Sequence, residues 1–328
     1  MAENKKVEKQ QSAWNLFVAG HRSEVTMGGA LIVLILVLCI IAPNFLSARN
    51  FTNIMSQVGF TAILALGQTF VMLTGGIDLS VGSVLGITSM VAAMLMRDTQ
   101  SVVLALLVAL LLGAFIGTVN GTLVSRFRIP AFVVTLGMMQ ICRSGDYLLS
   151  GGHGVSNLPD SFRAIAGAQI FKGFRVYYIF IILLFIFVHW VLSNTKLGRF
   201  TYAIGSNETA TRLAGVNTKL YTLLPYIISG TMAAIGGILM GSRFSAVDPN
   251  FGTNYEMNTL AAVVIGGCAM TGGKGTILGT AIGVLFMGVL SNGLDISGVS
   301  PYWQGVATGT VLIIALLVDH LLNRKANG

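Results

Sequence analysis

The sequence predicts an all-α polytopic membrane protein with about ten transmembrane helices and both termini in the cytoplasm. Its composition points the same way, because 54% of the 328 residues are hydrophobic and only 10% are charged, whereas soluble domains carry about 25% charged residues. This excludes a soluble globular domain. The net charge of +8 lies mostly between the apolar runs, so it forms no basic face of the kind that binds nucleic acid.

Ten apolar runs follow one another along the chain. Most approach the roughly 20 residues that are needed to cross the hydrocarbon core of a bilayer. The eighth run is short, and the second and third are joined by few residues, so the count of ten stays open by one at those places. The runs are 27–43, 53–74, 79–96, 101–123, 130–150, 177–193, 220–240, 258–270, 276–293 and 303–322.

The distribution of Lys and Arg predicts the orientation. If the N-terminus is cytoplasmic, 13 of the 20 Lys and Arg residues fall on the inner side, as the positive-inside rule expects. The prediction is then a cytoplasmic N-terminal segment 1–26, a single transmembrane domain 27–322 and a cytoplasmic tail 323–328. The polar segment 151–176 lies outside, and the segment 194–219 lies inside.

The segment 194–219 is the longest basic, polar interruption of the chain. Within it, Ser206 or Asn207 can cap a short helix, and Gly215 suits its left-handed stop. An apolar ridge on this helix is formed at i, i+3 and i+4 by Ala210, Leu213 and Ala214. The alternative is a solvated loop that only links two spans, and the helix signals alone leave both open.

Glycines recur at helical spacing in several of the runs. Such small-xxx-small patterns let two membrane helices approach closely. We therefore expect close helix packing at Gly113, Gly117 and Gly121, at Gly237 and Gly241, and at Gly275, Gly279 and Gly283.

Two strings echo each other in the two halves of the chain. Thr74-Gly75-Gly76 precedes one run and Thr271-Gly272-Gly273 precedes another. Paired glycine-interrupted segments often mark a transport path, although two tight hairpins would give the same strings. Between the first string and its run lies Asp78, one of few charges near hydrocarbon, where each needs a partner or water. Arg143 and Asp146 are spaced i, i+3 and could neutralise each other.

No catalytic chemistry is visible in the sequence. Paired carboxylates, Ser/His/Asp sets and His/Cys clusters with metal-ligand spacing are all absent from it. The string Gly272-Gly-Lys-Gly-Thr276 looks like a phosphate loop, but Cys268 stands where that motif requires glycine. We expect a protein that is not an enzyme and binds neither metal nor cofactor.

Three strings carry a resemblance to a known family. They are Gly75-Gly-Ile-Asp-Leu-Ser-Val-Gly82, Gly205-Ser-Asn-Glu-Thr-Ala-Thr-Arg-Leu-Ala-Gly215, and the segment from Tyr255-Glu256 to Gly272-Gly-Lys-Gly275. In order and spacing, from about residue 40 to 320, the chain resembles the membrane permeases of bacterial ABC sugar importers of the ribose/xylose/galactose type. Ribose-type permeases are the most alike.

The resemblance implies a bacterial inner-membrane homodimer with two kinds of partner. One is a cytoplasmic ATPase with two fused nucleotide-binding cassettes, which would bind ATP and Mg, and the other is an extracytoplasmic sugar-binding protein. A stand-alone secondary carrier of a small polar solute is the alternative.

The resemblance also implies the site residues. A coupling loop that docks on the ATPase would contain Gly205, Asn207, Glu208, Ala210, Arg212, Leu213, Ala214 and Gly215. The expected translocation path includes Gly75, Gly76, Asp78, Ser80 and Gly82. The binding protein would contact the outer segments 151–176 and 241–257.

Overall fold

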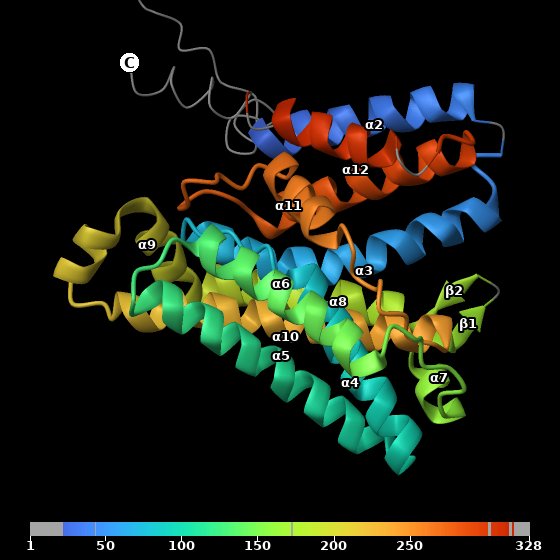
Figure 1. Cartoon of the computed structure of the whole chain (residues 1–328). Coiled ribbons are helices and arrows are strands. Elements are labelled where there is room, and N and C mark those ends of the chain that lie inside the picture. The colour runs from blue at the N-terminus through green and yellow to red at the C-terminus, as the bar shows by residue number, and fades with distance from the viewer. Residues whose placement is uncertain (1–21, 43, 172, 301–302, 315–316, 318–328) are drawn as a thin grey trace, which may run out of the picture.

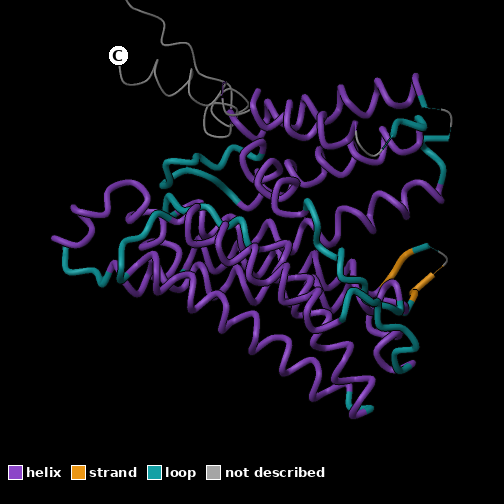
Figure 2. Tube along the Cα trace, viewed as in Figure 1, coloured by secondary structure: helices purple, strands orange, loops and turns teal. Residues whose placement is uncertain are grey.

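The computed structural model describes residues 22–42, 44–171, 173–300, 303–314 and 317, so most of the expected N-terminal segment and the whole tail lie outside the described residues. The described chain is helical, with one small hairpin (Figures 1 and 2). The elements are α2 (Arg22–Ile41), α3 (Ala48–Leu73), α4 (Val81–Thr99), α5 (Val102–Ser125), α6 (Ala131–Ser150), α7 (Asp160–Gly167), β1 (Gln169–Phe171), β2 (Phe174–Arg175), α8 (Val176–Asn194), α9 (Lys196–Leu213), α10 (Thr218–Phe244), α11 (Tyr255–Ile265), α12 (Ile277–Ile296) and the helix Trp303–Ile314.

The predicted all-α membrane fold is confirmed. Among the described residues, seven helices are long and apolar enough to cross a membrane, namely α2, α3, α4, α5, α8, α10 and α12. The helix α11 has only 11 residues, too few for a span. The run expected at 258–270 is therefore wrong in extent. Gly267, at φ +85°, ends the helix after Ile265 because a left-handed residue closes the last turn.

The two ends of the bundle carry different segments. Figure 1 shows α9 at one end, and α7 with the β1–β2 hairpin at the other. The segments 194–219 and 151–176 thus lie at opposite ends, as expected if one is cytoplasmic and the other external. The long helix α10 runs between these ends and contacts α7 and α9.

The helix α10 is the centre of the bundle, with α3, α4 and α5 packed around it. Its closest neighbour is α5. A Cβ atom added to Gly113 would overlap the carbonyl oxygen of Gly230, and one added to Gly117 would overlap that of Tyr226. The two backbones are therefore in direct contact, which a larger side chain would prevent.

The helices α11 and α12 form a hairpin with the same kind of contact. A Cβ on Gly279 would overlap the carbonyl oxygen of Gly266, and one on Gly283 would overlap that of Ala262. Gly275, at φ +146°, lies against Cys268 in the turn between the two helices. Each glycine of this series thus faces the partner segment of the hairpin.

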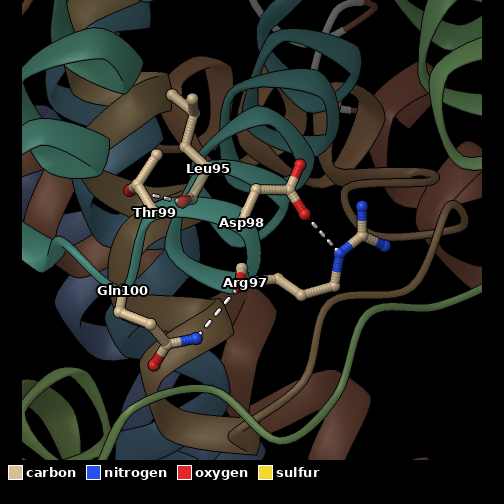
Figure 3. Close-up of polar contacts among 5 residues, drawn as sticks. All are labelled: Leu95, Arg97, Asp98, Thr99 and Gln100. Atoms are coloured by element: carbon tan, nitrogen blue, oxygen red, sulfur yellow. Dashed lines mark hydrogen bonds and ion pairs between the residues drawn. The ribbon is translucent and has the colours of Figure 1, made fainter.

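The outer end of α4 is closed by local bonds (Figure 3). Gln100 adopts the left-handed conformation, at φ +56°, and its side chain donates to the carbonyl oxygen of Arg97. Arg97 also pairs with Asp98 at 2.8 Å. Both charges are exposed, so the pair contributes little to stability.

We predict that Gly117→Leu destabilises the protein by about 1–3 kcal/mol or more, because the new side chain forces α5 away from α10. The matched control is Gly137→Leu on α6, where an added Cβ meets nothing within 4 Å. The measurement is the thermal unfolding midpoint of the detergent-solubilised protein. Equal midpoints for the two variants would contradict the prediction.

Candidate functional site

The segment α9 consists of two helices with a break at Asn207. This residue has φ −163° and ψ 98°, and its Oδ1 atom accepts a hydrogen bond from the backbone nitrogen of Ala210 at 2.9 Å. Asn207 is therefore the N-cap of the second helix. The stop follows at Gly215, with φ +83°, whose nitrogen donates to the carbonyl oxygen of Arg212 at 3.0 Å.

The apolar ridge of this second helix faces away from the rest of the chain. Ala210 and Ala214 are exposed, and 82% of Leu213 is accessible. The ridge lies outside the apolar membrane-spanning helices, at the end of the bundle that is expected to be cytoplasmic, so lipid does not explain its exposure. Exposed apolar groups in such a position are typical of a protein-binding surface.

Glu208 holds the short helix to the start of α10. Its Oε1 atom accepts a hydrogen bond from Thr218 Oγ1 at 3.2 Å. Glu208 and Arg212 form no ion pair, since the ion pairs found among the described residues are Arg97–Asp98 and Arg163–Asp160. The exposed Arg212 guanidinium therefore stays available to another molecule.

The first half of α9 packs on backbone at the cytoplasmic end of α3. A Cβ on Gly205 would overlap the carbonyl oxygen of Leu73 and the nitrogen of Gly273. The Gly273 nitrogen itself donates to that Leu73 oxygen at 2.9 Å. Three segments thus meet with no side chain between them. A Cβ at Gly205 would have to separate them.

Tyr202 adds a second hydrogen bond to this junction. Its hydroxyl donates to the carbonyl oxygen of Gly275 at 2.7 Å. Burial raises the pKa of Tyr202 to about 12, so the hydroxyl stays protonated and keeps donating at any physiological pH.

The two echoing glycine strings lie side by side at the same junction. The nearest atom to a Cβ added on Gly75 is the carbonyl oxygen of Thr271, at 3.2 Å, and a Cβ on Gly272 would lie 2.7 Å from the nitrogen of Gly75. Both glycines have positive φ, +80° and +87°, which glycine adopts at least cost. The echo therefore marks two loops in mutual contact, with α9 packed on them.

Between α3 and α4 the chain is not helical from residue 74 to residue 80, and Asp78 organises this segment. Asp78 Oδ1 accepts hydrogen bonds from the nitrogen and the hydroxyl of Ser80, at 2.9 and 2.6 Å. Asp78 Oδ2 accepts one from Ser229 of α10 at 2.7 Å. Asn120 of α5 donates to the Ser80 hydroxyl at 3.0 Å. The carboxylate thus links the segment to α10, and the Ser80 hydroxyl links it to α5.

This polar cluster is closed off from solvent. Only 2% of Asp78 and 1% of Ser80 is accessible. The nearest route is a cavity of about 370 Å³ on the cytoplasmic side, and Gly75, Gly76 and Tyr226 line it. The same cavity is lined by Glu208 and Arg212, so it lies between the second helix of α9 and the loop at Gly75 and Gly76.

The start of α4 packs on the segment before α11. A Cβ on Gly82 would overlap the carbonyl oxygen of Gly252 and the carboxylate of Glu256. Gly82, like Asp78, is buried. The structure thus gathers four of the five residues expected along the path around two loops, and places Gly82 one turn further on.

Arg143 and Asp146, whose spacing would let them neutralise each other, form no direct ion pair in the described part of the chain. Arg143 Nη1 donates instead to the carbonyl oxygens of Phe251 and Pro249, at 2.9 and 3.3 Å. Asp146 is fully buried, and its two carboxylate oxygens have no hydrogen-bond partner among the described residues. The helix spacing is favourable, but the outer loop before α11 supplies nearer acceptors.

Sequence reasoning missed Ser229 and Asn120 as parts of this site. Each is one of a few polar residues within a long apolar run, and only the fold brings it near Asp78. Their one signal was a hydrogen-bonding side chain in hydrocarbon, where polar groups need partners.

An exposed cytoplasmic ridge, glycine-broken helices and a closed polar cluster in the bundle define a membrane transport component. Residues 50–316 match the family described as branched-chain amino acid transport system / permease component, and the chain belongs to that family. As a permease component, the chain is not itself an enzyme. No solved structure matches it.

Curated relatives match over most of both chains. The ribose import permease protein of Escherichia coli (strain K12) is 40% identical over 296 residues, 89% of this chain and 92% of the relative. The ribose import permease protein of Bacillus subtilis (strain 168) is 37% identical, over 88% and 90%. The galactose/methyl galactoside import permease protein of Escherichia coli (strain K12) is 36% identical, over 90% and 94%.

We predict that Asp78→Ala lowers transport more than the double change Arg143→Ala with Asp146→Ala. Removing the carboxylate leaves buried donors of Ser80 and Ser229 without an acceptor, at about 1–3 kcal/mol each, whereas the double change leaves no unpaired charge. Asp78→Asn restores one acceptor and should recover part of the activity. Uptake is measured per amount of folded protein in the membrane. Normal uptake by Asp78→Ala would refute the prediction.

Proposed function

We propose that this chain is the permease subunit of an ATP-driven importer in the bacterial inner membrane, and that it moves a monosaccharide such as ribose into the cell. The observation that carries the proposal is the identity of 36–40% to permeases named for ribose and for galactose, over about nine-tenths of each chain. Membership of a permease-component family argues against a stand-alone carrier.

The proposed assembly has three kinds of subunit. Two copies of this chain form the pore, a cytoplasmic ATPase with two fused cassettes binds ATP and Mg, and an extracytoplasmic protein delivers the sugar. The exposed ridge of Ala210, Leu213 and Ala214 supports the ATPase contact, because these small side chains allow a partner surface to approach closely. Arg212 beside the ridge adds a donor for a carboxylate or carbonyl group.

The proposed mechanism is alternating access. When ATP closes the cassettes, the ridge moves with them, and α9 transmits the motion by its backbone contact with Leu73 and Gly273. The segment from Gly75 to Ser80 then shifts relative to α10. The hydrogen bonds of Asp78 to this segment and to Ser229 are the polar contacts that such a shift must exchange.

The function is tested in vesicles that contain the chain and its ATPase. We predict no monosaccharide uptake until the sugar-binding protein is added, because affinity is supplied by that partner and the membrane interior of the chain carries few polar groups. Labelled ribose and galactose are the probes, with ATP inside or outside the vesicles according to orientation. Uptake of free ribose at micromolar concentration without the binding protein would contradict the prediction.

The coupling contact gives a second test. We predict that Ala214→Glu abolishes transport and the stimulation of ATP hydrolysis while the protein still inserts and folds, since the change puts bulk and a desolvated charge into the interface. The control is Ser193→Glu, which adds the same charge at an exposed site on the same end of the bundle. Co-purification of the ATPase with Ala214→Glu at normal yield, with uptake intact, would place the docking site elsewhere.

A further inference from the structure

A cavity of about 740 Å³ opens at the outer end of the bundle, the end of Figure 1 that carries the β1–β2 hairpin. It lies between the first turns of α3 and the last turns of α10 and α12. Its volume falls within the range of about 300–1,000 Å³ that is typical of small-molecule sites. Its lining includes Asn53, Gln57, Arg243, Phe244, Asn292 and Asp295.

The wall on α3 is a stripe of hydrogen-bonding side chains. Asn50, Asn53 and Gln57 follow at i, i+3 and i+7, so they share one face of the helix. Asn50 is satisfied, because it and Asn292 of α12 exchange two amide hydrogen bonds at 2.8 and 2.9 Å. This buried pair joins α3 to α12 and fixes the first residue of the stripe in place.

Other polar side chains of the lining have hydrogen-bonding atoms without a partner among the described residues. The side chain of Asn53 is exposed and makes no hydrogen bond to any described residue. Gln57 Oε1 and Arg243 Nε are buried atoms, likewise without a partner in the described part of the chain. The cavity wall thus offers the exposed Asn53 amide, which can donate and accept, while the two buried atoms lie behind the surface of the wall.

An aromatic face completes the cavity. Phe244 is 57% exposed, although it ends the central helix of the bundle. A ring at this place offers an apolar surface beside the polar groups. Sugars present both kinds of surface, since their hydroxyl groups donate and accept and their ring C–H groups pack on aromatic faces.

The charged side chains of the lining are those of Arg49, Arg243 and Asp295. The Asp295 carboxylate is bonded to neutral amide groups. Both of its oxygens already accept amide hydrogen bonds, from Gln57 Nε2 at 3.0 Å and from Gln304 Nε2. Gln57 also lines a neighbouring cavity of about 180 Å³ that reaches Asn258 and Ser291, two further neutral polar groups.

We infer that this outer cavity is a low-affinity receiving site for a neutral monosaccharide, with Asn53 and the Arg243 guanidinium bonding its hydroxyl groups and Phe244 stacking on its ring. The inference rests on the proposed import of a sugar and adds where the solute first meets the permease. We expect a millimolar affinity, because the site offers few hydrogen bonds to the solute and is open to solvent. A weak site of this kind can release the solute again.

The test uses the full-length chain in lipid nanodiscs and saturation-transfer NMR, with ribose, galactose and leucine as separate probes. We predict transfer to ribose or galactose at millimolar concentration, strongest at ring C–H protons, and transfer to leucine no greater than in empty nanodiscs. Asn53→Leu and Phe244→Ala should each weaken sugar binding about tenfold, the loss of one polar contact or one stacking face. Neither change removes a hydrogen bond between side chains of the protein.

Two control variants carry the same chemical changes elsewhere. Gln140→Leu removes an exposed amide from α6, and Phe115→Ala removes a ring that is 63% exposed on α5. Both should bind sugar as the unchanged protein does. Sugar signals no higher than in empty nanodiscs, leucine signals equal to those of sugar, or equal losses in test and control variants would each overturn the inference.

The vesicle assay separates this inference from the proposed function. If the complete complex accumulates ribose or galactose while Asn53→Leu and Phe244→Ala bind sugar normally, the receiving site is wrong and the function stands. If the complex accumulates leucine and neither sugar, the proposed function is wrong, and the inference fails with it.

Discussion

The contact on which the rest depends is made by backbone alone, where the end of α3 meets α9 and the loop before α12. Gly205 lies on the carbonyl oxygen of Leu73, and Gly273 donates to that same oxygen at 2.9 Å. Side chains can change rotamer and absorb a small displacement, whereas two backbones in contact must move together. A displacement of α9 should therefore move the non-helical segment before α4 by nearly the same amount.

That segment is the least regular part of the bundle, and it is stable because Asp78 replaces the missing helical bonds. The carboxylate accepts three hydrogen bonds, two of them from Ser80 and one from Ser229 on α10. A buried carboxylate with fewer donors would cost several kcal/mol. A shift of the segment along α10 would break the bond from Ser229, and the carboxylate would then need another donor.

Patterns among neighbouring residues predicted the positions of most helices. They could not predict contacts between residues that are far apart in the sequence. The apolar runs located the membrane helices, and the cap at Asn207 with the stop at Gly215 located the short cytoplasmic helix, because each depends on neighbours a few residues away. Ser229 is 151 residues from Asp78, and no spacing rule connects them. Arg143 is a second such case, because its hydrogen bonds go to carbonyl groups of a loop more than 100 residues further on.

The outer cavity was missed for a related reason. Asn50, Asn53 and Gln57 open an apolar run, where sequence reasoning assigns polar residues to the solvated end of a helix. Two things make them a site, and both are tertiary: α12 satisfies Asn50 and so fixes the stripe, and α10 brings Arg243 and Phe244 opposite. The cavity is open and offers few hydrogen-bonding groups to a solute, so we expect the permease itself to bind a neutral solute weakly. Weak binding by the chain itself is consistent with import whose direction is set by partners on either side of the membrane.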